Sequence, residues 1–117
     1  MTITTTTTTT TTPTVVVLVT APSADSAASL ARTLVEEGLC ACGNVVPAIR
    51  SIYRWEGKVH DDAEALLVLK TERRLVPELK ARLPALHPYQ VPELLVLPVE
   101  DGLGPYLAWV RASVRPP

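Results

Sequence analysis

The spacing of hydrophobic and polar positions predicts a chain of alternating strands and helices. A continuous, mostly β-branched run over residues 15–20 is typical of a strand that is covered on both faces. From Ser26 to Val35 apolar residues recur at the spacing of one helix face, and Ser23 before them is the expected N-cap. Gly38 then marks the end of this helix.

The stretch from Cys42 to Thr71 predicts two long strands that fold back on each other at Glu56-Gly57. Counting outward from a two-residue turn places Cys42 opposite Thr71. Pro47 cannot donate a hydrogen bond to a ladder, which favours a bulge or bend at this position. A bulge would shift the pairing at the far end of the hairpin by one residue.

The returning strand of this hairpin is apolar on both faces over residues 66–69, although a small antiparallel sheet requires only one apolar face. A chain of this size has few spare elements to cover the second face. We therefore expect another copy of the chain to cover it, with the long hairpin reaching across.

The remaining pattern completes the fold class. An apolar stripe over residues 75–86 predicts a second helix, residues 94–97 predict a fourth strand, and Pro105 introduces a short terminal helix. The order is βαββαβ followed by a helix. We predict an α+β protein with a ferredoxin-like split βαβ sandwich, in which both main helices lie on one face of a four-stranded antiparallel sheet.

Length and composition indicate one folded domain with a short tail. The 117 residues have the size of a single domain, which we place at residues 15–117. Residues 4–12 are all threonine, fix no register and offer no apolar face, so residues 1–14 are predicted to form a tail. Because threonine favours strands, an extended edge segment lying on a sheet is the alternative.

Charge and hydropathy argue against several classes of partner. The 11 basic and 12 acidic residues are spread along the chain and give a net charge of −1, which argues against nucleic-acid binding. The longest apolar run, residues 15–19, is far shorter than the roughly 20 residues that a membrane-spanning helix needs. No signal-peptide pattern is present, so we expect a cytoplasmic protein with no membrane span.

Two cysteines and a histidine are candidate metal ligands. Cys40 and Cys42 lie two positions apart, and their thiolates could bind a soft metal such as Cu(I), but free cysteines more often act as small buried apolar side chains. His87 stands in a proline-rich loop, where it is either a ligand or general base, or a ring that packs or caps a helix end.

A lysine and several aromatic residues are candidates for binding a small molecule. Lys70 ends an apolar strand, where it either binds an anionic ligand or extends its charge from the edge of the core. Tyr53, Trp55 and Tyr89 either stack on a ligand or anchor a subunit interface. No Ser-His-Asp order, glycine-rich phosphate loop or paired-carboxylate motif is present, so the sequence indicates a protein that is not an enzyme.

Several separated motifs resemble one family in the right order. They are Cys42 with Asn44 and Pro47, then Ser51-Ile52-Tyr53-Arg54-Trp55-Glu56-Gly57-Lys58, Leu69-Lys70-Thr71, His87-Pro88-Tyr89 with Val91-Pro92-Glu93, and Tyr106-Leu107 with Trp109. From about Val15 to Val114 the chain resembles the CutA divalent-cation tolerance family. The resemblance implies the ferredoxin-like fold, a homotrimer similar to the PII signalling proteins, and a cytoplasmic role linked to copper and other divalent metals.

The resemblance also implies where a ligand binds. The family associates copper with a first-strand cysteine and a histidine pair before Pro-Tyr, whereas this chain has Val19 and Leu86 at two of those positions and keeps His87. It implies metal binding by His87 and Cys42, with no metal required for folding. It also implies a cleft between subunits that gathers the following residues: Cys42, Tyr53, Trp55, Lys70, His87, Tyr89 and Glu93.

Three functions follow from these observations. The leading hypothesis is a trimeric, non-enzymatic protein that responds to divalent metal ions and binds copper at an intersubunit cleft. The first alternative is a PII-like sensor of a small anionic ligand, based on Lys70 and the neighbouring aromatic residues. The second alternative is a trimeric anchor for other proteins.

Overall fold

The strands and helices follow one another in the predicted order in the computed structural model, which describes residues 11–117. The elements are β1 (Thr14–Ala21), α1 (Ala24–Glu36), β2 (Cys42–Trp55), β3 (Lys58–Glu72), the 3₁₀ helix η1 (Arg73–Leu75), α2 (Val76–Leu86), β4 (Leu95–Pro98) and α3 (Gly104–Ala112). The predicted threonine tail lies mostly outside the described residues, and Thr14 belongs to β1.

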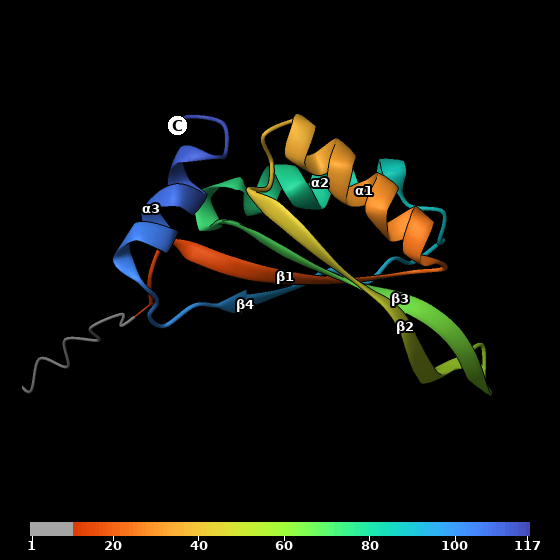
Figure 1. Ribbon diagram of the computed structural model, residues 1–117. Coiled ribbons are helices and arrows are strands. Elements are labelled where there is room, and N and C mark those ends of the chain that lie inside the picture. The colour runs from red at the N-terminus through yellow and green to blue at the C-terminus, as the bar shows by residue number, and fades with distance from the viewer. Residues whose placement is uncertain (1–10) are drawn as a thin grey trace, which may run out of the picture.

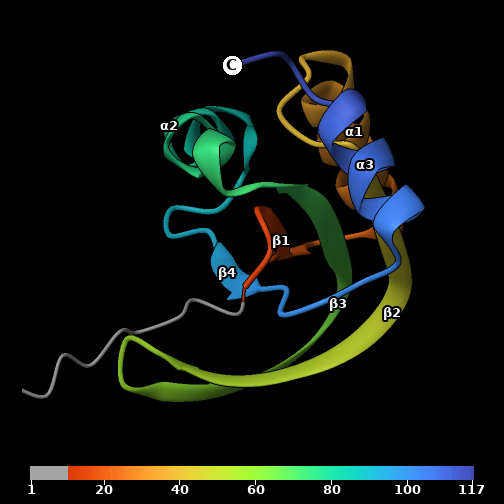
Figure 2. The same ribbon diagram turned by 90° about the vertical axis from the view of Figure 1, so that its left-hand side faces the viewer.

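The four strands form one antiparallel sheet in the order β2-β3-β1-β4. The helices lie on one side of this sheet, and within the described residues the other side carries no helix (Figures 1 and 2). This arrangement confirms the predicted α+β, ferredoxin-like fold. Among the described residues, no helix is long and apolar enough to cross a membrane.

The hydrophobic core lies between the sheet and the helices. Along β1 the side chains of Val15, Val17 and Val19 are fully buried, and those between them are only partly buried. Helices α1 and α2 cover the buried side with residues such as Leu34 and Leu79. Ser23 caps α1 as predicted, because its Oγ accepts a hydrogen bond from Ser26 N at 3.1 Å.

The opposite face of the sheet is apolar and uncovered in the single chain. Leu18 pairs with Val68 on one side and with Leu95 on the other, and all three side chains therefore point to the same face. Leu95 is 55% exposed and Leu97 is 45% exposed. The prediction that β1 is covered on both faces is thus met on only one face within a single chain.

The β2–β3 hairpin extends well beyond the rest of the sheet (Figures 1 and 2). Among the described strands, residues 49–64 pair only with each other, since β1 pairs with β3 from Ala65 onward. Glu56 and Gly57 both have positive φ angles, of 50° and 77°, as a two-residue type I′ turn requires.

The predicted bulge is present between Val46 and Ile49, where two residues of β2 lie opposite one residue of β3. It shifts the pairing by one residue. Cys42 therefore lies opposite Lys70 and not opposite Thr71, as simple counting from the turn would give. The bulge marks the point at which the hairpin leaves the body of the sheet.

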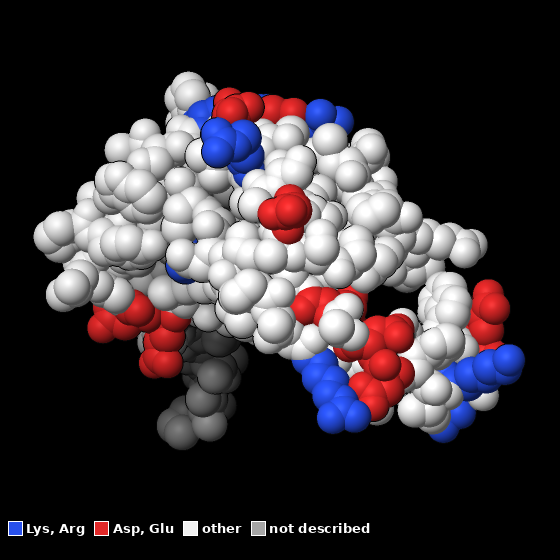
Figure 3. All heavy atoms as spheres, turned by 45° about the vertical axis from the view of Figure 1, so that its right-hand side comes forward, with Lys and Arg blue, Asp and Glu red and all other residues white. Residues whose placement is uncertain are grey.

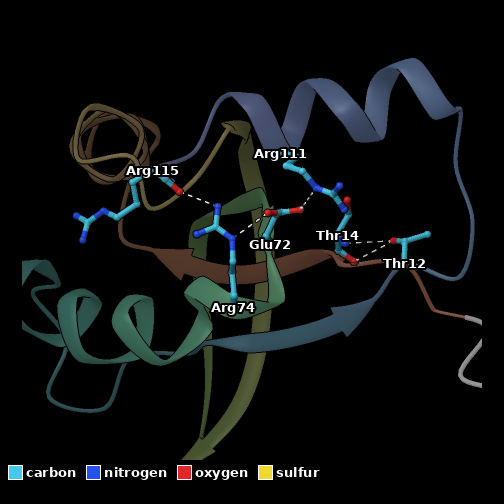
Figure 4. A network of polar contacts seen from close by, with 6 residues as sticks. All are labelled: Thr12, Thr14, Glu72, Arg74, Arg111 and Arg115. Atoms are coloured by element: carbon cyan, nitrogen blue, oxygen red, sulfur yellow. Dashed lines mark hydrogen bonds and ion pairs between the residues drawn. The ribbon is translucent and has the colours of Figure 1, made fainter. Parts of the chain in front are cut away.

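A buried carboxylate joins the end of β3 to the C-terminal part of the chain (Figure 4). The Glu72 side chain accepts hydrogen bonds from Arg74 Nε at 3.1 Å and from Arg111 Nε at 3.2 Å. Arg74 also donates to the Arg115 carbonyl oxygen at 2.7 Å. The end of β3, helix α3 and the last residues are thereby connected.

Candidate functional site

The predicted site residues fall into two groups within one chain. Cys42 and Lys70 lie opposite each other in the body of the sheet, whereas four other residues line a cavity at the base of the hairpin, namely Tyr53, Trp55, Tyr89 and Glu93. Glu64, which also lines the cavity, precedes Lys70 by six residues on β3, which corresponds to about 20 Å. A single chain therefore does not bring all the predicted residues together.

The group around Cys42 contains three polar neighbours. Lys70 Nζ donates a hydrogen bond to Asn44 Oδ1, and Cys42 Sγ lies 3.9 Å from Tyr106 OH on α3. The anionic-ligand hypothesis placed Lys70 beside the aromatic residues of the hairpin. Within one chain Lys70 lies instead beside Cys42, and it is not part of the cavity lining.

Cys40 is a buried thiol. Its side chain is fully buried, and burial, together with the nearby Cys42 thiol, raises the pKa of Cys40 to about 12. The thiolate is the form that binds metals and reacts with electrophiles. Cys40 therefore acts as a small buried apolar side chain, which was the second of its two predicted roles. Cys42 is left as the thiol that can bind a ligand.

We expect Cys40 to resist alkylation in the folded protein. A pKa of about 12 leaves a roughly 1000-fold smaller thiolate fraction than the ordinary value of 9.0, and burial also blocks access. In a Cys42→Ser variant, where Cys40 is the remaining thiol, iodoacetamide labelling followed by mass spectrometry should show almost no adduct until urea is added. Equal labelling rates in the folded and unfolded protein would contradict the burial of Cys40.

His87 uses both ring nitrogens to fix the loop that follows α2. Its Nε2 donates to the Thr20 carbonyl oxygen at 2.7 Å, and its Nδ1 accepts from the Tyr89 backbone N–H at 3.1 Å. The carbonyl can only accept and the amide can only donate, so the geometry fits a neutral ring with its proton on Nε2. A metal ion could reach either nitrogen only after one of these bonds had broken.

Asp61 and Asp62 on the hairpin are engaged with neighbouring side chains. Asp61 accepts two hydrogen bonds from Arg50, at 2.8 and 2.7 Å, and Asp62 accepts one from Tyr53 OH at 2.5 Å. Each of these contacts shifts a pKa: the Arg50 bond lowers that of Asp61, and the Asp62 bond raises that of Tyr53. Within residues 11–117, no three groups of the His, Cys, Asp or Glu type are gathered as a metal site.

The cavity at the base of the hairpin has a volume of about 660 Å³. Its lining consists of Thr20, Ser51, Ile52, Tyr53, Trp55, Glu64, Pro88, Tyr89, Gln90, Val91 and Glu93. The β2–β3 hairpin supplies one wall and the loop between α2 and β4 supplies another. Figure 3 shows acidic side chains gathered where the hairpin leaves the body of the molecule, beside a hollow in the surface.

Glu64 is a cavity residue that sequence reasoning missed. Its Oε2 accepts a hydrogen bond from Tyr89 OH at 2.6 Å, which joins the hairpin to the loop. Burial and this bond raise the pKa of Tyr89. The available signal was the position of Glu64, a single carboxylate directly before the apolar run of β3.

The second carboxylate of the cavity is Glu93. Burial and the charge of Glu64 raise the pKa of Glu93. Among the described ion pairs, neither carboxylate has a basic partner. The cavity therefore combines aromatic walls with two carboxylates that lack a counterion among residues 11–117.

Comparisons with family models, curated proteins and solved structures all find proteins that carry the name CutA or CutA1. Residues 15–113 match the family described as "CutA1 divalent ion tolerance protein". The "Divalent-cation tolerance protein CutA" of Thermus thermophilus is 52% identical over 94 residues, which cover 80% of this chain and 91% of the relative. "Protein CutA" of Homo sapiens is 48% identical over 92 residues, which cover 79% of this chain and 51% of the human protein. The crystal structure of CutA1 from Oryza sativa has a TM-score of 0.85 at 45% identity and covers 91% of this chain and 97% of that chain.

Proposed function

This chain belongs to the CutA1 divalent ion tolerance protein family, and on that basis we propose that it is a non-enzymatic homotrimer that acts in the tolerance of divalent metal ions. The proposal includes the cytoplasmic location expected from the sequence. The names of its relatives describe a tolerance protein and no catalytic activity. The observation that carries the proposal is the uncovered apolar face of the sheet.

That face needs a partner of matching shape. Residues from all four strands contribute to it, including Val46, Leu66, Val68, Leu18 and Leu95. A contiguous apolar surface of this kind costs free energy in water and favours association. The other face of the hairpin also carries exposed apolar side chains, since Ile52 is 67% exposed and Val59 is 65% exposed.

A second copy of the chain fits this requirement, because an identical sheet offers the same apolar surface. The hairpin protrudes beyond the rest of the sheet (Figure 1), and we propose that it packs against an adjacent subunit. The number of three copies follows from the resemblance to trimeric proteins of the family. In such a trimer the three uncovered faces would be buried together.

The proposed metal site uses Cys42 and His87 with ligands from different subunits. Within one chain Cys42 lies opposite Lys70, which pairs with Val16, whereas His87 contacts Thr20 four residues further along β1. We therefore propose that a site with both residues forms across a subunit boundary. His87 must also release either Thr20 or Tyr89 before a ring nitrogen can bind. Cys42 is partly exposed and its sulfur is a ligand suited to copper, so we expect it to contribute more to the affinity.

Metal titration tests this proposal. We expect the trimer to bind Cu(I), Cu(II) or Zn(II) saturably in isothermal titration calorimetry, and Cys42→Ser to weaken binding by at least about tenfold. His87→Ala should also weaken it, whereas His60→Ala is the matched control because His60 is the other histidine of the chain. Absence of saturable binding, or equal affinities for all variants, would remove the metal site from the proposal.

A further inference from the structure

We propose that Asp101 and Gly102 form a modification site, at which the main chain rearranges spontaneously to an isoaspartyl linkage. This proposal goes beyond metal tolerance and concerns the loop between β4 and α3, residues 99–103. It rests on the contact between the two residues, on the exposure of the loop, and on a comparison with the other aspartates and the asparagine of the chain.

The loop brings the two reacting groups together. The Gly102 backbone N–H donates a hydrogen bond to Asp101 Oδ1 at 2.9 Å, so the nitrogen lies beside the carboxyl carbon of the preceding side chain. Groups that are held about 3–3.5 Å apart are close to an attack geometry, which lowers the barrier to reaction. Gly102 has no side chain to hinder the approach, and both residues are exposed.

The reaction needs no reagent other than water. The Gly102 nitrogen attacks Cγ of the neutral carboxyl group of Asp101, and the nitrogen proton leaves with the carboxyl OH as water. The product is a five-membered succinimide ring. A water molecule then adds to the former backbone carbonyl of Asp101 and breaks its bond to the nitrogen. The main chain now runs through the side-chain carbon atoms, and the α-carboxylate is free.

The other candidate residues lie in regular structure. Asp25 lies in α1, Asn44 lies in β2, and Asp61 and Asp62 lie in β3, where neighbouring side chains engage their carboxylates. A backbone that is held by helix or ladder hydrogen bonds resists the rotation that closes the ring. Asp101 is therefore the aspartate for which we expect the fastest rearrangement.

The modification changes the entry to α3. Gly102 packs against Leu107, since a Cβ atom at this glycine would lie 3.2 Å from Leu107 Cδ2. The isoaspartyl linkage lengthens the main chain by one methylene group and displaces this contact. The same helix carries the buried Val110 and also Arg111, which donates to Glu72. Modified chains should therefore show faster amide hydrogen exchange in α3 than unmodified chains.

Peptide mapping of the intact protein after prolonged incubation tests the proposal. Trypsin cleaves after lysine and arginine, so it places the aspartates in three peptides, residues 1–32, 59–70 and 83–111. Isoaspartate in each peptide is identified by chromatography and electron-transfer fragmentation. We expect it to accumulate at least about tenfold faster in peptide 83–111, which contains Asp101, than in the other two.

Two variants sharpen the test. Asp101→Glu is the matched control, because it keeps the negative charge but would have to close a six-membered ring, and its peptide 83–111 should stay unmodified. Gly102→Ala adds a methyl group beside the attacking nitrogen and should slow the reaction by about tenfold. Circular dichroism before and after incubation establishes that each protein stays folded.

Two results would overturn the proposal. The first is an equal rate in all three peptides, which would show that the Asp101-Gly102 contact has no effect. The second is a rate at Asp101 more than about tenfold below that of a synthetic peptide of residues 97–107, because the folded loop would then prevent ring closure. Neither result depends on metal binding, so this proposal and the metal proposal can fail separately.

Discussion

Replacing Gly43 by alanine is expected to lower the free energy of unfolding by about 1–3 kcal/mol, although only one methyl group is added. A Cβ atom on Gly43 would lie 2.9 Å from Ala31 Cβ on α1, 3.1 Å from Leu69 Cδ2 and 3.2 Å from Leu67 Cδ1. The leucine methyl groups can rotate away. The Ala31 Cβ is fixed to the helix backbone, so α1 itself would have to move away from the sheet.

Chemical denaturation at one fixed protein concentration measures this effect, because subunit association makes stability depend on concentration. Gly104→Ala is the matched control, since nothing lies within 4 Å of the methyl group that it adds. In a double-mutant cycle, Ala31→Gly should make Gly43→Ala less destabilising, because it removes the closest contact. If the Gly43→Ala variant were as stable as the Gly104→Ala control, that result would contradict the close contact between α1 and β2 at Gly43.

Replacing Val68 by glutamate is expected to dissociate the proposed trimer. Val68 lies at the centre of the uncovered face, between Leu18 on β1 and Asn44 on β2. In the assembled trimer the new carboxylate would be taken out of water, which costs several kcal/mol. Lys70, whose Nζ binds Asn44 opposite Val68, offsets only part of this cost. The midpoint of dissociation should move to a concentration at least about 100-fold higher than in the unchanged protein.

Light scattering coupled to size-exclusion chromatography over a range of concentrations measures this shift. Ala28→Glu, on the exposed side of α1, introduces the same charge away from the sheet and should remain trimeric. Secondary structure from circular dichroism shows whether the Val68 variant still folds. A trimer of unchanged stability in Val68→Glu would show that this face is not the interface.

Much of the fold could be predicted because local chemistry determines it. Glu56-Gly57 marks the hairpin turn, and the apolar spacing identifies which side of each strand is buried. Pro47 even indicates the bulge that brings Cys42 opposite Lys70. Each of these features depends on residues that are close in the sequence or directly paired.

The site was harder to predict because its parts come from distant elements. Tyr53, Trp55, Tyr89 and Glu93 do line one cavity, but the contribution of Glu64 depends on how the loop after α2 lies against the hairpin. That position depends on side-chain packing at the end of α2, which periodicity does not describe. For the same reason the sequence did not reveal that His87 lies apart from Cys42.

The strand order has a consequence for biosynthesis. Strand β1 is synthesised first, yet its neighbours are β3, which ends at Glu72, and β4, which ends at Pro98. On the ribosome the apolar residues of β1 therefore stay unpaired until β3 and β4 have been synthesised, whereas the hairpin can form from residues that are adjacent in the sequence. We therefore infer that the sheet is completed only after β4 has been synthesised, and that nascent β1 needs protection from aggregation until then.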